Sequence, residues 1–182
     1  MGNDRYTLYD DAEWYFEKAL ANYISDYQKN EASLTDEDYK IINEYAGNHI
    51  AYFITWIIKN KFESDFFAET LNVSESVEAV RNETMTGADF LFEHCDGKLD
   101  GEMLSDEILP FVDWFYEKYY FDRYYVDWVI RVMDDLPLEM QWSWEDYHSF
   151  EKVLNRRYEI YMEKQRSFKE WEEKRKKSAD TE

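Results

Sequence analysis

The segment from Asp96 to Glu107 comes closer to a metal site than any other stretch of the sequence. It has aspartate at its first and fifth positions, glycine at its sixth and glutamate at its twelfth, as in a twelve-residue calcium-binding loop. Asp96, Asp100 and Glu107 would supply the carboxylates. Lys98 occupies the third position, however, where an oxygen ligand is needed and a cation opposes Ca²⁺. The sequence therefore predicts a loop with Asx-type turns, with a metal site as the alternative, and no cofactor is expected.

Residues for covalent or acid–base chemistry are few and scattered. The histidines are His49, His94 and His148, and no set of four ligands has zinc-site spacing. Cys95 is the single cysteine; it needs a nearby base to act as a nucleophile, and the adjacent His94 would point elsewhere on a helix. No glycine-rich phosphate loop or nucleophile elbow occurs. We expect His49 to be a hydrogen-bonded core residue, Cys95 an inert buried thiol, and the chain not to be an enzyme.

The charge is strongly negative and unevenly placed. The chain has 41 acidic and 21 basic residues, a net charge of −20, and residues 1–142 hold 31 of the acids but 11 of the bases. Such a surface repels nucleic acid and anionic membranes and attracts basic partners, although an acidic surface also simply favours solubility. The sequence contains no apolar run of membrane-spanning length and no signal-peptide core at its N-terminus. These features, with the lone cysteine, predict a cytoplasmic protein that binds neither membrane nor nucleic acid.

The elements that must position these residues are predicted to be helices, because the 182 residues include only five glycines and two prolines. Apolar residues spaced by three and four predict a helix of more than twenty residues after a Thr35–Asp38 capping box; they are Ile42, Tyr45, Ala46, His49, Phe53, Trp56 and Ile57. Asp11, Ser74 and Thr86 are expected to cap other helices, and Pro110 to stand in the first turn of another. Cys95 to Gly101 is expected to be a loop, and residues 119–133 fit either strand or helix.

The last segment, residues 143–182, is predicted to be mostly one helix of about 50 Å. Tyr147, Leu154, Tyr161 and Phe168 recur every seven residues, which suits packing along the body, but beyond Met162 the apolar face thins. We expect that end to project, fray or meet a partner. The predicted fold is mainly α: a single compact helical domain with a long C-terminal helix and possibly a little strand, divided into an acidic body (1–142) and the C-terminal helix (143–182).

Three motifs together resemble an uncharacterised bacterial domain family over about residues 9–128. They are YDDAEW at 9–14, NHIAYFITW at 48–56 and CDGKL at 95–99. The members look like immunity-type proteins, the cytoplasmic antidotes encoded beside contact-dependent or polymorphic toxins. The resemblance implies such a role here. It also implies that the shared residues mark the structural core; they are Asp10, Asp11, Trp14, His49, Trp56, Cys95, Asp96 and Gly97.

The sequence and the resemblance together favour a protein that neutralises a cognate toxin domain, in particular a basic nuclease, by stoichiometric binding. Carboxylates would occupy the toxin's phosphate-binding groups, and exposed tyrosines would anchor the contact. The candidate partner-binding residues are Glu102, Asp106, Glu107, Asp122, Asp127, Asp134, Asp135, Tyr120 and Tyr124. The alternatives are a helical regulatory or scaffolding protein whose projecting end binds another helix, and a metal-binding protein that uses the Asp96–Glu107 loop.

Overall fold

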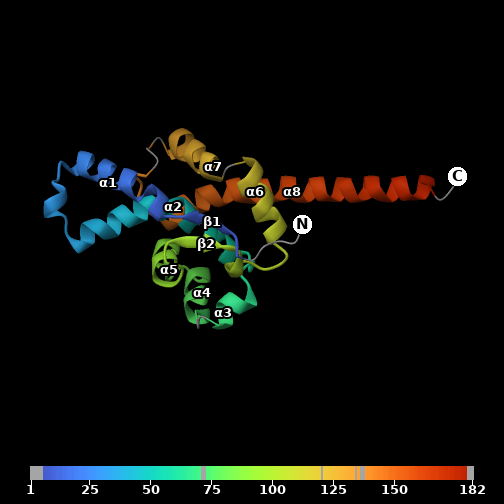
Figure 1. Ribbon diagram of the computed structural model, residues 1–182, viewed down its shortest axis with the longest axis horizontal. Coiled ribbons are helices and arrows are strands. Elements are labelled where there is room, and N and C mark those ends of the chain that lie inside the picture. The colour runs from blue at the N-terminus through green and yellow to red at the C-terminus, as the bar shows by residue number, and fades with distance from the viewer. Residues whose placement is uncertain (1–5, 71–72, 120, 134, 136–137, 180–182) are drawn as a thin grey trace.

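The computed structural model describes residues 6–70, 73–119, 121–133, 135 and 138–179. The elements follow in the order β1 (Leu8–Asp11), α1 (Glu13–Tyr27), η1 (Glu31–Ser33), α2 (Asp36–Lys59), α3 (Asp65–Thr70), α4 (Ser74–Arg81), α5 (Gly87–His94), β2 (Lys98–Asp100), η2 (Gly101–Met103), α6 (Leu109–Tyr119), α7 (Phe121–Trp128), the π-helical turn η3 (Val129–Met133) and α8 (Trp144–Ala179). The prediction of a mainly α fold with a long C-terminal helix and little strand is confirmed (Figure 1).

Helix α2 is the centre of the fold. It contacts α1, α4, α5 and α8, and every residue from Tyr45 to Ile58 is buried. Thr35 forms the predicted capping box, since its side chain accepts from the backbone N–H of Asp38 while the Asp38 carboxylate accepts from the N–H of Thr35. The predicted spacing of apolar residues therefore identified the helix around which the others pack.

Aromatic side chains fill the core between α2, α6 and α8. The Trp56 ring is fully buried, and its centroid lies 5.7 Å from the ring centroids of Phe111 on α6 and Tyr158 on α8. Its indole Nε1 donates to Asn155 Oδ1 at 2.8 Å, which satisfies the one polar atom of the side chain. Trp56 thus fixes the position of α8 on the body.

A two-stranded antiparallel sheet joins the N-terminal segment to the turn after α5. Leu8 pairs with Asp100 and Asp11 with Lys98, with an irregularity between Leu8 and Asp10. The prediction of a loop over Cys95–Gly101 is wrong in its second half, because Lys98–Asp100 are strand β2. The turn before it is as predicted: Asp96 and Gly97 both have positive φ, at 52° and 72°.

Two predicted caps differ in detail. Helix α1 has Ala12 at its N-cap rather than Asp11, although Asp11 Oδ1 still accepts from the Glu13 backbone N–H at 2.9 Å. Ser74 is the first residue of α4, and Val73 stands at the N-cap position instead. Among the described residues, no side chain forms a capping hydrogen bond at the start of α4. Thr86 caps α5 as predicted, and Ser143 caps α8 through a 3.1 Å bond from the Asp146 N–H.

Residues 119–133 were predicted to be either strand or helix. Within this segment, residues 121–133 are helical and form α7 and η3. Pro110 stands in the first turn of α6, as predicted. Leu136 and Pro137, predicted to break the chain, lie outside the described residues.

Helix α8 has 36 residues, about 54 Å at 1.5 Å per residue. Tyr147, Phe150 and Leu154 are buried against the body, whereas residues 162–176 are all exposed. In Figure 1 this half of α8 extends well past the other elements. Among the described residues, no helix combines the length and apolarity needed to cross a membrane.

Candidate functional site

Two adjoining hollows, each of about 320 Å³, form one acidic groove beside α2. They share Asn43 and Phe92 in their linings, so they are neighbours: one lies beside the first turns of α2 and the other beside the turn before β2. The lining residues are Asp11, Ala12, Glu13 and Phe16 near the start of α1, Asp36, Tyr39, Lys40, Asn43 and Glu44 on α2, Ala88, Asp89, Phe92 and Glu93 on α5, and Asp96, Gly97 and Lys98 in the turn.

Local sequence rules place the two helical walls. On α2 the lining residues recur at spacings of three and four, so they occupy one face of the first turns. On α5 the Thr86 cap fixes the helix start, and Asp89 and Glu93 follow four residues apart. The groove therefore lies between α2 and α5, and polar side chains of both helices line it.

Gly97 forms one end of the groove, in the turn between α5 and β2. Its carbonyl accepts from the Ala12 N–H at 3.0 Å, and a Cβ at this position would stand 3.3 Å from the Phe92 ring and 3.4 Å from the Ala12 Cβ. Together with the φ of 72°, this close approach requires glycine. Part of the CDGKL motif thus shapes a wall of the groove.

Carboxylates dominate the charge of the groove. Seven acidic side chains and two lysines line it. The Lys98 ammonium lies 2.6 Å from Asp96 and lowers the pKa of that carboxyl, and the Lys40 ammonium lies 3.7 Å from Asp89. Burial raises the pKa of the Glu44 carboxyl, so its charged form is poorly solvated. A cation placed in the groove would stabilise that charge.

Aromatic rings give the groove an apolar side. The rings of Phe16 and Tyr39 stack with centroids 6.5 Å apart, and Phe92 lies at the boundary of the two hollows. Carboxylates beside partly exposed aromatic rings suit lysine and arginine side chains, which pair through the charged head and pack through the aliphatic stem or guanidinium plane. The arrangement can bind a basic, partly apolar surface.

This groove was not predicted from the sequence, because its lining residues come from segments more than fifty positions apart. One signal was present: the first turns of α2 are polar at Asp36, Lys40, Asn43 and Glu44, whereas the rest of the helix is mostly apolar and buried. A polar stripe on the start of a central helix marks a face that the fold leaves open.

The carboxylates and tyrosines predicted from sequence lie elsewhere. Asp106 and Glu107 are exposed beside a third hollow, and the backbone N–H of Glu102 is bound to Asp100 Oδ1 at 2.9 Å. Asp127 lies 3.7 Å from Arg131, and Asp135 is exposed after η3. Tyr124 lies under the Arg157 guanidinium at 4.2 Å. Tyr120, Asp134 and the side chain of Asp122 lie outside the described residues. Their role in partner binding stays a prediction.

The motif residues divide between core and surface. Asp10, His49, Trp56 and Cys95 are buried, and Asp10 Oδ2 lies 3.2 Å from His49 Nε2. Burial raises the pKa of the Cys95 thiol far above its usual range, which fits an inert thiol. Trp14 is 60% exposed and Asp96 is also exposed, so the expectation that the motif marks the core does not hold for them.

The alternative calcium loop does not assemble. The Asp96 carboxylate is paired with Lys98, and Asp100 Oδ1 accepts from the backbone N–H groups of Glu102 and Met103. Within the described part of the chain, no three histidine, cysteine or carboxylate side chains gather as metal ligands would. The opposing Lys98 and the β2 pairing explain why the twelve-residue spacing does not form a loop around an ion.

Comparison with known proteins gives one match. Residues 8–142 match a family model described as Domain of unknown function (DUF7832). Neither the curated proteins nor the solved structures provide a match.

Proposed function

We propose that this chain, which belongs to the DUF7832 family of unknown function, is a cytoplasmic immunity-type protein that neutralises a basic toxin domain by binding it. The proposal rests on one observation, the groove in which seven carboxylates and three aromatic side chains lie together. A basic nuclease suits this groove because its phosphate-binding lysines and arginines carry the complementary charge. Occupying those groups would block the nuclease from its substrate.

The distribution of charge supports the same proposal. The body carries the whole net charge of −20, so its field attracts a cationic partner over distances of about 10 Å in moderate salt. Once the partner docks, the aromatic rings of the groove supply apolar contact that salt does not screen. Binding is thus fast because of the charge and persistent because of the rings.

Neutralising three groove carboxylates is expected to weaken partner binding. In the variant Glu13→Gln, Glu44→Gln, Glu93→Gln, each lost charge removes about 0.5 kcal/mol, which together raises Kd roughly tenfold. The measurement is capture of a basic protein from the native bacterium by the tagged chain, followed by Kd determination with the purified partner at low salt and near 0.5 M salt, where the Debye length is about 4 Å.

The matched control is Glu69→Gln, Glu75→Gln, Glu145→Gln, which removes three exposed carboxylates outside the groove. The control should keep the wild-type Kd and salt dependence. Equal weakening in both variants would show that the acids act as a general charged coat, and failure to retain any basic protein would refute the proposal. Rescue of growth when the partner is co-expressed with the chain establishes neutralisation as distinct from binding.

Removing the residues after Met162 is expected to leave partner binding unchanged. The groove is built from α1, α2, α5 and the turn before β2, none of which depends on the exposed half of α8. The measurement is the same Kd with the truncated chain. Loss of binding would favour the regulatory or scaffolding alternative, in which the projecting helix is the binding element.

A further inference from the structure

The exposed end of α8 carries an aromatic pair on the face that packs against the body. We call residues 162–179 the distal segment. Within it, Phe168 follows the buried Tyr147, Leu154 and Tyr161 at intervals of seven residues, so it continues the same stripe. Phe168 is 57% exposed and Trp171 53% exposed, and their ring centroids lie 5.9 Å apart. The packing face of α8 thus extends beyond the body that covers its first half.

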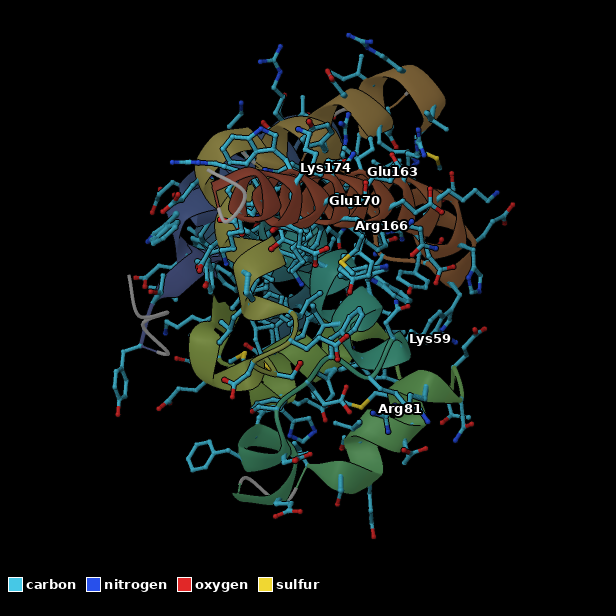
Figure 2. All side chains as sticks on the ribbon, turned by 90° about the vertical axis from the view of Figure 1, so that its right-hand side faces the viewer. Lys59, Arg81, Glu163, Arg166, Glu170 and Lys174 are labelled. Atoms are coloured by element: carbon cyan, nitrogen blue, oxygen red, sulfur yellow. The ribbon has the colours of Figure 1, made fainter. Side chains whose placement is uncertain are left out.

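The opposite face of the distal segment is polar and can remain exposed to solvent. Glu163, Arg166, Glu170 and Lys174 alternate in sign at spacings of three and four along the helix, and Figure 2 shows them following one another along α8. Such spacing stabilises a solvent-exposed helix by a few tenths of a kcal/mol per pair. The projecting helix is therefore compatible with water on its outer face, and the unpartnered surface is the aromatic one.

The distal segment is basic, in contrast to the rest of the chain. It has seven basic and four acidic residues, a charge of +3, whereas residues 1–161 carry −21. Arg175 lies over the Trp171 ring at 5.5 Å, so a cation accompanies the aromatic pair, and Lys176 beside it is exposed. The last turns of α8 thus present aromatic and positive groups together.

An acidic hollow of about 300 Å³ lies on the body near the point where α8 leaves it. Its lining includes Glu63, Asp65, Asp106 and Glu107, with Lys61 and the half-exposed Phe66. The hollow is near α8, because Phe62, which lies between its lining residues Lys61 and Glu63, has its ring centroid 5.4 Å from that of Tyr158, one turn before Met162. The body therefore offers negative charge and an exposed ring beside the exit of its own basic helix.

We propose that a second copy of this chain covers the distal segment, with the two segments packed antiparallel about a two-fold axis. Eighteen residues make about 27 Å of helix, so full overlap brings the last turn of one copy level with Met162 of the other. The aromatic pairs then meet at the centre, and Arg175 and Lys176 of each copy stand level with residues 165–166 of the other, about one turn beyond Met162, from where their long side chains extend toward the acidic hollow.

Charge selects this arrangement over the alternatives. Both a parallel and an antiparallel pair place two +3 segments side by side, but a parallel pair also keeps both basic ends away from the acidic bodies. The antiparallel pair places each basic end beside an acidic surface, and the two-fold axis repeats the contact reciprocally. The chain supplies both complementary surfaces, which is the argument for a second copy over an unrelated helix. The contact is independent of the proposed toxin-binding groove.

The test is sedimentation equilibrium of the full chain over a wide concentration range. We expect the mass to rise from 22.3 kDa toward twice that value, and to fall back near 0.5 M salt, where the Debye length is about 4 Å. The variant Phe168→Ser, Trp171→Ser should stay monomeric. The control Glu163→Ser, Glu170→Ser changes the outer face of the same segment and should still dimerise. A wild-type chain that is monomeric throughout, or a dimer that survives loss of both rings, overturns the proposal.

Reversing the charges of the acidic hollow and of the basic helix end tests whether a second copy of the chain is the partner. Asp106→Lys with Glu107→Lys should weaken the dimer at least tenfold, and adding Arg175→Glu with Lys176→Glu to the same chain should restore it. Restoration requires that the hollow of one copy meets the basic end of another. A dimer unaffected by the first reversal, or not restored by the second, contradicts the antiparallel contact.

Discussion

Replacing Asp10 by alanine is expected to lower the free energy of unfolding by about 1 to 3 kcal/mol, because it removes a buried carboxylate that contacts His49 and accepts a backbone hydrogen bond. Asp10 Oδ2 lies 3.2 Å from His49 Nε2, and the two residues are 3% and 2% exposed. The substitution leaves the imidazole without its carboxylate in a site that water does not reach. It also removes the acceptor of the Asp11 backbone N–H, which lies 3.0 Å from Asp10 Oδ1.

The position of the pair makes this loss consequential for the fold. Asp10 belongs to β1 and His49 to the middle of α2, so the contact fastens the N-terminal strand to the central helix. The His49 ring also lies edge-on to Tyr15, with centroids 4.5 Å apart, which places the start of α1. Because domains of this size are stable by only about 5 to 15 kcal/mol, a loss of this size is a substantial part of the total.

Urea denaturation of Asp10→Ala, Asp10→Asn and His49→Ala measures the effect. Asp10→Asn keeps an oxygen that can accept from the Asp11 N–H, so it should lose less than Asp10→Ala and remain folded if the alanine variant does not. The double variant Asp10→Ala, His49→Ala should lose less than the sum of the single losses, since the two side chains contact each other and each single change already removes that contact. Additive losses, or a loss below about 1 kcal/mol for Asp10→Ala, would mean that the pair is not what anchors β1.

The sequence predicted the features that depend on neighbouring residues. The Thr35–Asp38 box, the Thr86 cap and the helical spacing from Ile42 to Ile57 each lie within one element, and the structure has all of them. The spacing of Tyr147, Leu154 and Tyr161 likewise predicted which face of α8 packs on the body. These features can be predicted from sequence because the interactions that stabilise them form between residues close together in the chain.

Features that depend on distant pairing were missed. Strand β2 is three residues long and exists because β1, some ninety residues earlier, pairs with it, so its own sequence reads as a turn. The acidic groove forms only where α5 packs closely against α2. Within the sequences of these two helices, only the glycines indicate such close packing. The predicted carboxylates were chosen by sequence proximity, whereas the groove gathers residues from four segments.

Gly87 is the residue that permits α5 to approach α2, and Gly87→Ala is expected to cost about 2 to 3 kcal/mol of stability. A Cβ there would lie 1.9 Å from Thr55 Oγ1 and 2.8 Å from the backbone oxygen of Ala51. Thr55 is fully buried, and its hydroxyl donates to that same oxygen at 2.6 Å, so neither atom can move away easily. The added methyl must push α5 outward.

The displacement of α5 links this stability effect to function. Asp89, Phe92 and Glu93 of the groove all lie on α5, so Gly87→Ala should weaken capture of the basic partner even where the protein stays folded. Leu154→Ala is the matched control, because Leu154 is fully buried on α8 and lines neither hollow of the groove. It should also cost at least about 2 kcal/mol of stability, yet leave capture of the basic partner unchanged.

Thermal and urea unfolding in two backgrounds separates the clash from other causes. In a Thr55→Ala chain the nearest obstacle to the new methyl is gone, although the Ala51 oxygen remains, so Gly87→Ala should cost less there than in the wild type. An equal cost in both backgrounds would place the strain elsewhere than at Thr55. If Gly87→Ala were neutral in both, α5 would have freedom to shift on α2, and the groove would be a flexible surface rather than a preformed site for a basic partner.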